Sequence, residues 1–584
     1  MTAFHKLWKI LTPSQQIASG KQLSMIFAGM LLETLGVGLV IPALIVMTQG
    51  DIARTYPNVS ILLSFFDNFN HEELVIIGML ALTGIYFIKM IFLGFLTWSQ
   101  AHFVLDIQAS LSQRLFAGYL RKPYVFHLQN NSAQLIRNTI GHVGEIVSVI
   151  RQTLILISES FILIAISILL LVMEPLGAIF VVSLLGITSW IFGLITRRHI
   201  SKWGLAREYN EGLRIQALQE GLGAAKDVKL LGRENDFLTH YQEHNFGSAK
   251  VGQYQITLQG LPRLWLELLA VLGLAMLVIM LIITGRPLDA LFPTIGLFAA
   301  AAFRLLPSVN RVIGAIQSMR FSLPVVETMY GEICSMNKAD HVVSRKAPLA
   351  FKKEISLHNV SFKYSSAEIG VLKNVNLSIF NGQSVGFIGS SGAGKSTLVD
   401  IMLGLLSPTN GAVKIDGVDI QNNTRGWQDQ IGYVPQNIFL TDDTLRRNIA
   451  FGLSDKLIDE NSVWLALHNA QLEEFVKSLP KGLDTKVGER GVRLSGGQRQ
   501  RIGIARALYH APAVLVLDEA TSSLDTSTER EVMSTIKKMH GNKTIIIVAH
   551  RLSTVEHCDH LYKLEHGKIH EVTFNPITKK VNRK

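Results

Sequence analysis

The stretch from Gly389 to Ser396 reads Gly-Ser-Ser-Gly-Ala-Gly-Lys-Ser and matches the phosphate-binding pattern G-x-x-x-x-G-K-[ST] at every position. Glycines let the backbone curl until its N–H groups point at a phosphate chain, and the following helix adds the positive end of its dipole. An apolar, strand-like run precedes the loop and helically spaced apolar residues follow it, so the sequence predicts a nucleotide site at a strand-to-helix turn. Lys395 should reach the β- and γ-phosphates, and the Ser396 hydroxyl should bind Mg²⁺. The expected nucleotide contacts are Gly389, Ser390, Ser391, Gly392, Ala393, Gly394, Lys395, Ser396 and Thr397.

The composition indicates more than one domain and a large apolar part. The chain has 584 residues, 48% of them hydrophobic, and a mean hydropathy of +0.29. Its formal net charge of +11 is compatible with nucleic acid, an anionic membrane surface or basic cytoplasmic loops, so charge alone does not identify a partner. The two cysteines, Cys334 and Cys558, belong to no C-x-x-C pair, which indicates neither a disulfide framework nor a zinc site.

Six apolar runs in the first half have roughly the length needed to cross a bilayer core of about 30 Å. They are Leu23–Met47, Leu74–Thr97, Leu154–Met173, Leu176–Thr196, Leu264–Thr284 and Ala290–Leu306. We therefore expect a helical transmembrane domain over residues 23–323, a linker over residues 324–350 and an α/β domain over residues 351–584.

The first 22 residues precede the first span and carry three lysines but no acidic residue. Their apolar side chains recur at helical spacing: Phe4, Leu7, Trp8 and Leu11. This pattern predicts an amphipathic helix lying on the membrane surface, and the alternative is a solvated tail.

The distribution of charge predicts which connections lie in the cytoplasm. Residues Gly50 to Glu73 contain mainly acidic charges, whereas the connections after the second and fourth spans are long and rich in Arg and Lys. The amino terminus and the phosphate loop should therefore lie inside. The long connections should extend the spans as cytoplasmic helices, with breaks at Asn130–Ser132 and Gly221–Gly223 that are well placed to touch the ATP-binding domain. Outside, Val59–Phe69 has the spacing of a short amphipathic helix.

Three cations, Lys89, Arg263 and Arg304, interrupt or border the spans, where a charge at the bilayer centre costs about 2.5–3.5 kcal/mol. Two explanations are open. The cations can reach the inner interface, with Arg263 paired to Glu267 one helical turn away. Alternatively they face a central cavity and bind an anionic head group such as a pyrophosphate. The acids in the spans, Glu33 and Glu159, are candidate counter-charges.

In the second half, apolar strand-like runs alternate with helical patterns, as in an α/β domain. Residues 513–519 read Ala-Val-Leu-Val-Leu-Asp-Glu, a buried strand ending in two carboxylates. We expect Asp518 to hold Mg²⁺, directly or through water, and Glu519 to orient and polarise the attacking water.

Residues 494–498 read Leu-Ser-Gly-Gly-Gln and precede an Arg-rich helical stretch. Ser495, the amides of Gly496 and Gly497 and the helix amino terminus can form a second anion cradle, with Gln498 completing the motif. Here the chain resembles the ABC transporter ATPases, whose signature motif this is.

The resemblance implies further site residues. Gln436 in Val-Pro-Gln is similar to the glutamine that contacts Mg²⁺ and the attacking water. His550 in Val-Ala-His-Arg is similar to the switch histidine at the γ-phosphate, and Asp525 in Ser-Ser-Leu-Asp to the D-loop aspartate. Tyr364 in Val-Ser-Phe-Lys-Tyr is similar to the aromatic residue that stacks on adenine.

In that family the cradle of one ATPase domain closes over the phosphate loop of another. The resemblance thus implies an exporter-type half-transporter that works as a homodimer with ATP and Mg²⁺, in a bacterial inner membrane and without nucleic acid. The stretches Pro262–Glu267, Phe303–Arg311 and Lys563–Lys568 resemble bacterial flippases of lipid-linked oligosaccharides in protein glycosylation. Transport of such a polyprenyl pyrophosphate sugar to the outer leaflet is the favoured hypothesis. A lipid or drug exporter, and an ABC ATPase on a membrane anchor or gated channel, are the alternatives.

Overall fold

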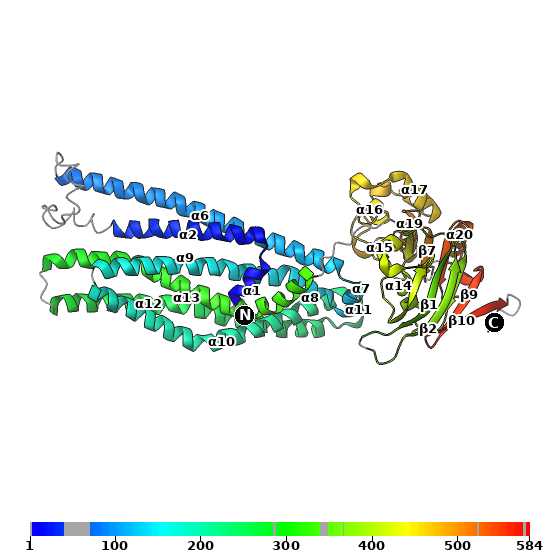
Figure 1. Ribbon diagram of the computed structural model, residues 1–584, viewed down its shortest axis with the longest axis horizontal. Coiled ribbons are helices and arrows are strands. Elements are labelled where there is room, and N and C mark those ends of the chain that lie inside the picture. Colours follow the sequence, from blue (N-terminus) through cyan, green and yellow to red (C-terminus); the bar gives the residue numbers. More distant parts are fainter. Residues whose placement is uncertain are drawn as a thin grey trace. The chain divides into compact units, whose positions relative to one another are not determined.

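The computed structural model describes residues 3–39, 71–173, 175–283, 288–338, 349–365, 367–521, 525–549, 551–575 and 580–583. The chain divides into two compact units, Met1–Lys122 with Gln129–His341, and Pro123–Leu128 with Val342–Lys584. The first unit is helical, and the second combines sheets with helices (Figure 1). The predicted fold class, a helical transmembrane domain followed by an α/β ATPase domain, is confirmed.

Long helices make up the first unit. They are α1 (Ala3–Ile10), α2 (Pro13–Gly38), α6 (His71–Arg121), α8 (Ser132–Arg137), the π-helix η2 (Asn138–His142), α9 (Val143–Met173), α10 (Pro175–Gly223), α11 (Ala225–Leu231), α12 (Glu234–Ile283) and α13 (Leu288–Lys338). Within the described residues, four stretches have the length and hydropathy to cross a membrane: Val75–Arg121, Ser132–Val172, Gly177–Gly223 and Glu234–Met276. Part of the first expected span and all of the predicted helix at Val59–Phe69 lie outside the described residues.

The chain leaves the helical conformation at both predicted breaks, although the long helix α6 already ends earlier, at Arg121. The short helix α7 (Tyr124–Gln129), which belongs to the second unit up to Leu128, ends just before Asn131 caps α8 by accepting a hydrogen bond from the Ala133 N–H at 2.9 Å. Helix α10 ends at Gly223, and Gly232, with φ +62°, separates α11 from α12.

The amino-terminal residues form two helices where one was expected. Helix α2 starts with a capping box in which Thr12 is the N-cap and Gln15 its partner, and Pro13 occupies the first helical position. This start lies well before residue 22. Helix α1 buries Leu7 and Ile10, and the Arg114 guanidinium donates to the Ile10 carbonyl at 3.0 Å. One face of α1 therefore packs on the protein itself, while its placement on a membrane surface stays a prediction.

Helix α13 also differs from its predicted bounds, since it continues to Lys338 through the first part of the expected linker. Val326, Met329 and Ile333 are buried at helical spacing along this extension. Their interval of three and four residues is the helical signal that the scattered charges of this region obscured.

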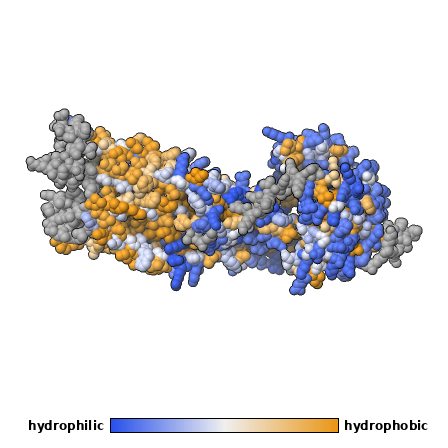
Figure 2. Space-filling model, viewed as in Figure 1, coloured by the Kyte–Doolittle hydropathy of each residue, from blue (hydrophilic) through white to orange (hydrophobic). Residues whose placement is uncertain are grey.

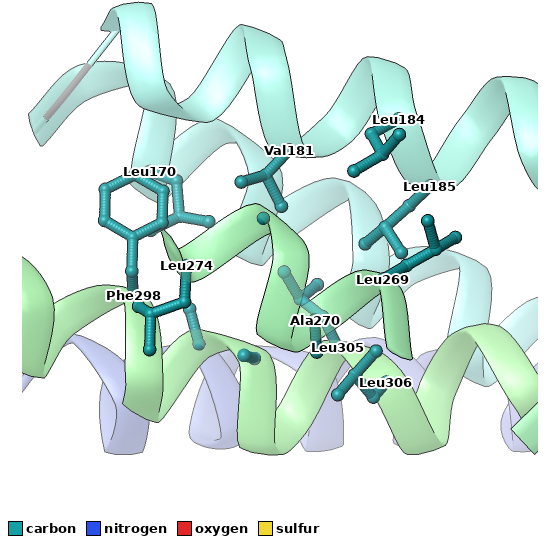
Figure 3. A pocket seen from close by; sticks show the side chains of 13 residues that line it. Leu170, Val181, Leu184, Leu185, Leu269, Ala270, Leu274, Phe298, Leu305 and Leu306 are labelled. Carbon is teal, nitrogen blue, oxygen red and sulfur yellow. The ribbon is translucent and has the colours of Figure 1, made fainter. Parts of the chain in front are cut away.

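Side chains around the bundle match a lipid environment. Figure 2 shows hydrophobic side chains over much of one face of the helical unit, and large apolar side chains such as Phe87, Trp190 and Val271 are exposed. Inside, a cavity of about 40 Å³ between α9, α10, α12 and α13 is lined only by apolar residues, among them Leu170 and Phe298 (Figure 3).

The second unit contains two sheets with helices packed against them. Its strands are β1 (Glu354–Phe362), β2 (Leu372–Phe380), β3 (Ser384–Ile388), β4 (Asn410–Ile415), β5 (Val418–Asp419), β6 (Ile431–Val434), β7 (Val514–Asp518), β8 (Thr544–Val548), β9 (His560–Glu565), β10 (Lys568–Asn575) and β11 (Lys580–Arg583). Its further α-helices are α14 (Lys395–Met402), α15 (Thr424–Gln428), α16 (Leu445–Ile449), α17 (Glu460–Asn469), α18 (Glu473–Ser478), α19 (Gly496–Leu508), α20 (Thr526–Lys538) and α21 (Leu552–Val555). The antiparallel sheet has the order β2-β1-β4-β5, and the larger sheet has the order β11-β10-β9-β3-β8-β7-β6.

The centre of the larger sheet is parallel, because β9, β3, β8, β7 and β6 all pair in the same direction. Successive side chains of β7 enter different hydrophobic cores, with Leu515 and Leu517 in one and Val514 and Val516 in the other. Burial on both faces explains the uninterrupted apolar runs of β3, β7 and β8. The carboxyl ends of these strands share one edge, where the predicted ATP-site residues follow β3 and β7.

Candidate ATP site and membrane charge cluster

The predicted phosphate loop lies between β3 and α14. Gly389 and Gly394 have φ values of +155° and +103°, and a Cβ at Gly389 would lie 2.5 Å from the Leu564 carbonyl oxygen. The Lys395 ammonium donates to the carbonyl oxygens of Gly389 at 2.9 Å and Ser390 at 3.0 Å. These bonds hold its charge directly against the loop that should cradle phosphate.

Burial lowers the pKa of Lys395 from its ordinary value, and the nearby carboxylates of Glu519 and Asp518 act in the opposite direction. A bound phosphate would add negative charge beside this ammonium and favour its charged form. The lysine that the sequence assigns to the nucleotide is therefore a buried cation with carboxylates in its surroundings.

The two predicted carboxylates stand at the end of β7. Glu519 has a left-handed backbone, with φ +50°, and its N–H donates to the Val548 carbonyl at 3.0 Å. The Gln436 amide donates to the Glu519 carboxylate at 2.8 Å. The structure thus brings together two residues that are far apart in the sequence and that were both assigned to the attacking water.

The residues predicted to hold Mg²⁺ offer the oxygen ligands that this cation prefers: the Ser396 hydroxyl, the Gln436 amide and the Asp518 carboxylate. Burial, together with repulsion from Asp518, raises the pKa of Asp400 to about 6, so the site concentrates negative charge that a divalent cation would offset. No group of three His, Cys, Asp or Glu suited to a metal is found among the described residues, and the ion would take its other ligands from phosphate and water.

Tyr364 lies beside the start of α14. Its hydroxyl is 3.3 Å from the Thr397 hydroxyl, and its ring packs edge-on against Phe362 with centroids 4.8 Å apart. This places an aromatic ring next to the phosphate loop, and its stacking on adenine stays a prediction.

The signature residues form the beginning of α19. The Ser495 hydroxyl accepts from the Gln498 N–H at 3.2 Å, and the Gln498 side chain accepts from the Ser495 N–H at 2.8 Å. This capping box presents the amides of Gly496 and Gly497 at the helix start, and its hydrogen bonds are local to α19.

Asp525 likewise caps its own helix, α20, by accepting from the Thr528 N–H at 3.1 Å and from the Ser527 hydroxyl. These bonds hold the pKa of Asp525 below its ordinary value. His550 lies outside the described residues, so its role stays a prediction.

In the helical unit, two of the three predicted cations meet at one acid. Lys89 Nζ lies 2.7 Å from one Glu33 carboxylate oxygen, and Arg304 Nη2 lies 2.9 Å from the other. The side chains are 5% exposed for Glu33, 13% for Lys89 and 23% for Arg304. We call these three residues the Glu33 cluster. Lys89 Nζ also lies 4.7 Å from the centroid of the Tyr86 ring, a cation–π contact that the sequence did not indicate.

Arg263 is not part of the Glu33 cluster. It pairs with Glu267 at 2.8 Å on its own helix, and its side chain is 74% exposed. The other buried acid, Glu159, is bound by Arg311 at 2.7 Å and 3.3 Å. The sequence indicated Glu159 as a candidate counter-charge but did not indicate Arg311 as its partner. The available signal was that both are charged residues in otherwise apolar helices.

Together the fold and the site define an ATP-driven membrane transporter with one helical unit and one ATPase unit in each chain. Residues 372–522 match the family model described as ABC transporter, and residues 39–300 match the ABC transporter transmembrane region. The chain belongs to the ABC transporter family. It is a multi-pass protein of the bacterial inner membrane, with a cytoplasmic ATPase domain that couples ATP hydrolysis to transport.

Relatives match most of the chain. The chain is 30% identical over 478 residues to an ATP-dependent lipid A-core flippase of Ralstonia nicotianae, and the matched region covers 79% of this chain and 78% of that protein. A protein of the same name from Nitrosococcus oceani is 30% identical over 492 residues, covering 82% and 79% of the two chains. The solved structure of a bacterial Atm1-family ABC exporter with ATP bound has a TM-score of 0.76 at 22% identity, covering 95% of this chain and 94% of that one. The chain therefore has the exporter fold.

Proposed function

We propose that this protein is a lipid flippase that works as a homodimer and uses ATP to move a lipid with a phosphorylated head group across the membrane. Two lines of support converge on a lipid. Relatives that match about four fifths of the chain are named lipid A-core flippases. The membrane helices also hold two cations that share one carboxylate.

The Glu33 cluster carries the proposal. Lys89 and Arg304 together bear two positive charges against one negative charge, inside helices that otherwise present apolar side chains to lipid. A net cation in this environment is costly, and an anionic ligand would offset the cost. Both cations retain some exposure while Glu33 has almost none, so a ligand can reach the cations without displacing the acid. Arginine binds phosphate in a fork, whereas lysine acts as a point charge.

The relatives favour a lipid exporter over the lipid-linked oligosaccharide flippase that the membrane stretches suggested. A polyprenyl pyrophosphate sugar stays a second candidate, because Arg304 and Arg311 both belong to the stretch Phe303–Arg311 that resembles those flippases. Both substrates carry phosphate next to a long hydrocarbon part. An uncharged drug gives the cations of the cluster no role.

The ATP site supports a dimer, since one chain carries one phosphate loop and one signature. We infer that Ser495 to Gln498 of a second copy completes each site. In the capping box the Ser495 hydroxyl oxygen already accepts a hydrogen bond, which leaves its proton free to be donated to a phosphate oxygen.

In the completed site Lys395 neutralises the β- and γ-phosphates and Tyr364 supports the base. Bound Mg²⁺ would neutralise the charge that develops on the phosphates, and Ser396, Gln436 and Asp518 would hold it. Glu519 orients the attacking water and accepts its proton, and the amide of Gln436 fixes the rotamer of that carboxylate. His550 and Asp525 keep the roles that the family resemblance implies.

A flipping assay tests the lipid proposal. The full-length protein is reconstituted in vesicles with two fluorescent glycolipids of equal chain length, one phosphorylated and one dephosphorylated. We expect ATP-dependent translocation of the phosphorylated lipid alone, and a fall of about tenfold or more in Lys89→Ala and Arg304→Ala while ATP hydrolysis persists. Arg233→Ala removes an exposed cytoplasmic arginine and serves as the matched control. Equal translocation of both lipids, or full activity in both cluster variants, would contradict the proposal.

A polyprenyl pyrophosphate sugar tested in the same vesicles separates the two candidate substrates. Transport of this lipid but not of the phosphorylated glycolipid would favour the second candidate. Stimulation of ATP hydrolysis by apolar drugs, without transport of either phosphorylated lipid, would favour a drug exporter.

A further inference from the structure

Glu529 joins three segments next to the catalytic carboxylate, and no sequence motif assigned it a role. One of its carboxylate oxygens accepts from the Thr521 hydroxyl at 2.9 Å and from the Thr554 hydroxyl at 3.3 Å. The other accepts from the Arg551 guanidinium at 3.4 Å. The Glu529 side chain is only 12% exposed, so these contacts replace most of its hydration.

The three partners flank the residues that should act on the γ-phosphate. Thr521 is two positions after Glu519, where the chain leaves β7. Arg551 and Thr554 belong to the segment that follows β8, and Arg551 directly follows His550 in the sequence. The Glu529 carboxylate on α20 therefore binds the segments that directly follow β7 and β8, two neighbouring parallel strands.

The backbone of Glu519 is tied to the same place. Its N–H donates to the Val548 carbonyl, the last residue of β8, and its left-handed φ of +50° is one that a residue with a side chain rarely adopts. Glu519 also lines one cavity of about 60 Å³ together with Thr521, Arg551 and Thr554. Glu519 therefore lies next to the three residues that Glu529 binds.

Helix α20 is anchored well enough to act as a support. Asp525 caps its amino terminus, and Val532 and Ile536 are buried in the core on the same helix. Gln436 donates a hydrogen bond to the Glu519 carboxylate itself at 2.8 Å. Glu529 thus binds Thr521, just after Glu519 in the chain, whereas Gln436 binds the side chain of Glu519.

We propose that Glu529 is a positioning residue for ATP hydrolysis, which fixes Glu519 and the segment after β8 relative to each other through Thr521, Arg551 and Thr554. The inference rests on the proposed role of Glu519 as the residue that orients water. A displacement of about 1 Å in a reacting group can cost roughly 10²-fold in rate, so loss of this support should reduce turnover and leave nucleotide binding intact.

The test uses the full-length transporter in lipid nanodiscs and measures kcat and KM for ATP. We expect Glu529→Ala to lower kcat by about 10- to 100-fold with KM within about twofold of the wild type. Glu529→Gln keeps an oxygen that can accept from the two threonines and loses the charge that faces Arg551, so its kcat should fall less. The matched control is Glu531→Gln on the same helix, whose side chain is exposed, and its kcat should be unchanged.

A merely structural role is separated by counting active sites. Saturation binding of a labelled non-hydrolysable ATP analogue gives the fraction of folded sites, and kcat is expressed per binding site. The proposal requires kcat per site to fall, and the double variant Glu529→Ala with Thr521→Val should lose less than the product of the two single effects, since both act through one contact.

Two results would overturn the inference. One is a loss of activity in Glu529→Ala that matches the loss of nucleotide-binding sites, and the other is a kcat equal to that of the wild type. Glu519→Gln in the same assay distinguishes the levels of the argument. If Glu519→Gln keeps its turnover, the proposed role of Glu519 is wrong, whereas a loss there with full activity in the Glu529 variants rejects only the role of Glu529.

Discussion

The membrane unit and the ATPase unit each hold a cluster of charged side chains, and the two clusters have net charges of opposite sign. In the membrane unit, Glu33 is almost fully buried and lies between Lys89 at 2.7 Å and Arg304 at 2.9 Å. In the ATPase unit, Asp400 and Asp518 repel each other, and burial together with this repulsion raises the pKa of Asp400 to about 6. The cluster in the membrane unit has an excess of positive charge, and the cluster in the ATPase unit is rich in negative charge.

The difference follows from what each site can draw from its surroundings. Helices in lipid have neither water nor free ions to stabilise a charge, so a buried acid needs protein cations beside it. The ATP site opens to water and receives its cation with the nucleotide, so it can leave acids close together when empty. The sign of the uncompensated charge agrees with the ligand proposed for each site: an anion for the Glu33 cluster and a metal–nucleotide complex for the ATP site.

The largest effect is expected from Glu519→Gln in the ATP site. The amide keeps an oxygen for the Gln436 hydrogen bond but cannot accept a proton from water, so ATP turnover should fall by about 10²-fold or more. Steady-state hydrolysis by the reconstituted transporter measures this fall, and retained binding of a fluorescent ATP analogue shows that the site is intact. Turnover at the wild-type rate would assign the proton to another group.

The next effect is expected from Glu33→Ala in the membrane unit. Removing the shared acid leaves Lys89 and Arg304 close together without it, and breaking a buried pair in this way costs about 3–5 kcal/mol. The thermal unfolding temperature of the purified protein in detergent should fall clearly.

A triple apolar variant sharpens this prediction. Glu33→Leu combined with Lys89→Met and Arg304→Met removes every charge of the cluster, and unfolding should return to near the wild-type temperature because no buried charge is left alone. Transport of the phosphorylated lipid should still be lost. If Glu33→Ala unfolds at the same temperature as the wild type, the acid is not the counter-charge of the two cations.

The places of the phosphate loop and of the two carboxylates in the fold were predictable because these residues belong to short motifs. Gly389 to Ser396 and Asp518 with Glu519 each occupy consecutive positions, and the strand before each of them has an apolar pattern that the fold confirms. The Gln436 contact with Glu519 was indicated by family resemblance alone. Glu529 could not be found in this way, since its partners are eight to 25 positions away and its role depends on how α20 packs beside β7 and β8.

The membrane cluster was only partly predictable, for a related reason. The Arg263–Glu267 pair follows from the spacing of one helical turn and is confirmed. The Glu33 cluster joins α2, α6 and α13, so its partners depend on how three helices pack and which way their side chains point. Sequence reasoning could state that such cations need a partner and could name Glu33 as a candidate, but spacing could not assign it to Lys89 and Arg304.

A smaller effect is expected from Asp400→Asn, and it depends on pH. The pKa of Asp400 is about 6 in the folded protein against an ordinary 3.8, so the folded state keeps a proton that the unfolded state has lost between about pH 4 and pH 6. The free energy of unfolding therefore falls as pH rises through this window. Because Asp400 is only half-buried, solvent screening should limit the loss to about 1 kcal/mol.

Thermal unfolding without nucleotide measures this dependence. Asp400→Asn should be more stable than the wild type above pH 6, and this advantage should shrink toward pH 3, where Asp400 is largely protonated in both states. Added Mg²⁺ and ATP should reduce the advantage, since a cation beside Asp518 makes the charged form of Asp400 less costly. An advantage that is the same at pH 4 and pH 7 would mean that packing, and not charge, is responsible.

The smallest effect is expected from Arg263→Gln. Arg263 and Arg304 are both arginines in apolar helices, yet Arg263 is 74% exposed and bonded within its own helix, while Arg304 is 23% exposed and reaches an acid on another helix. An exposed pair one turn apart contributes little to stability. Arg263→Gln should therefore leave the unfolding temperature unchanged, whereas Arg304→Gln should lower it because Glu33 then keeps Lys89 alone. If the two variants lose the same stability, the bond of Arg304 to the buried Glu33 does not distinguish it from Arg263, and this explanation is wrong.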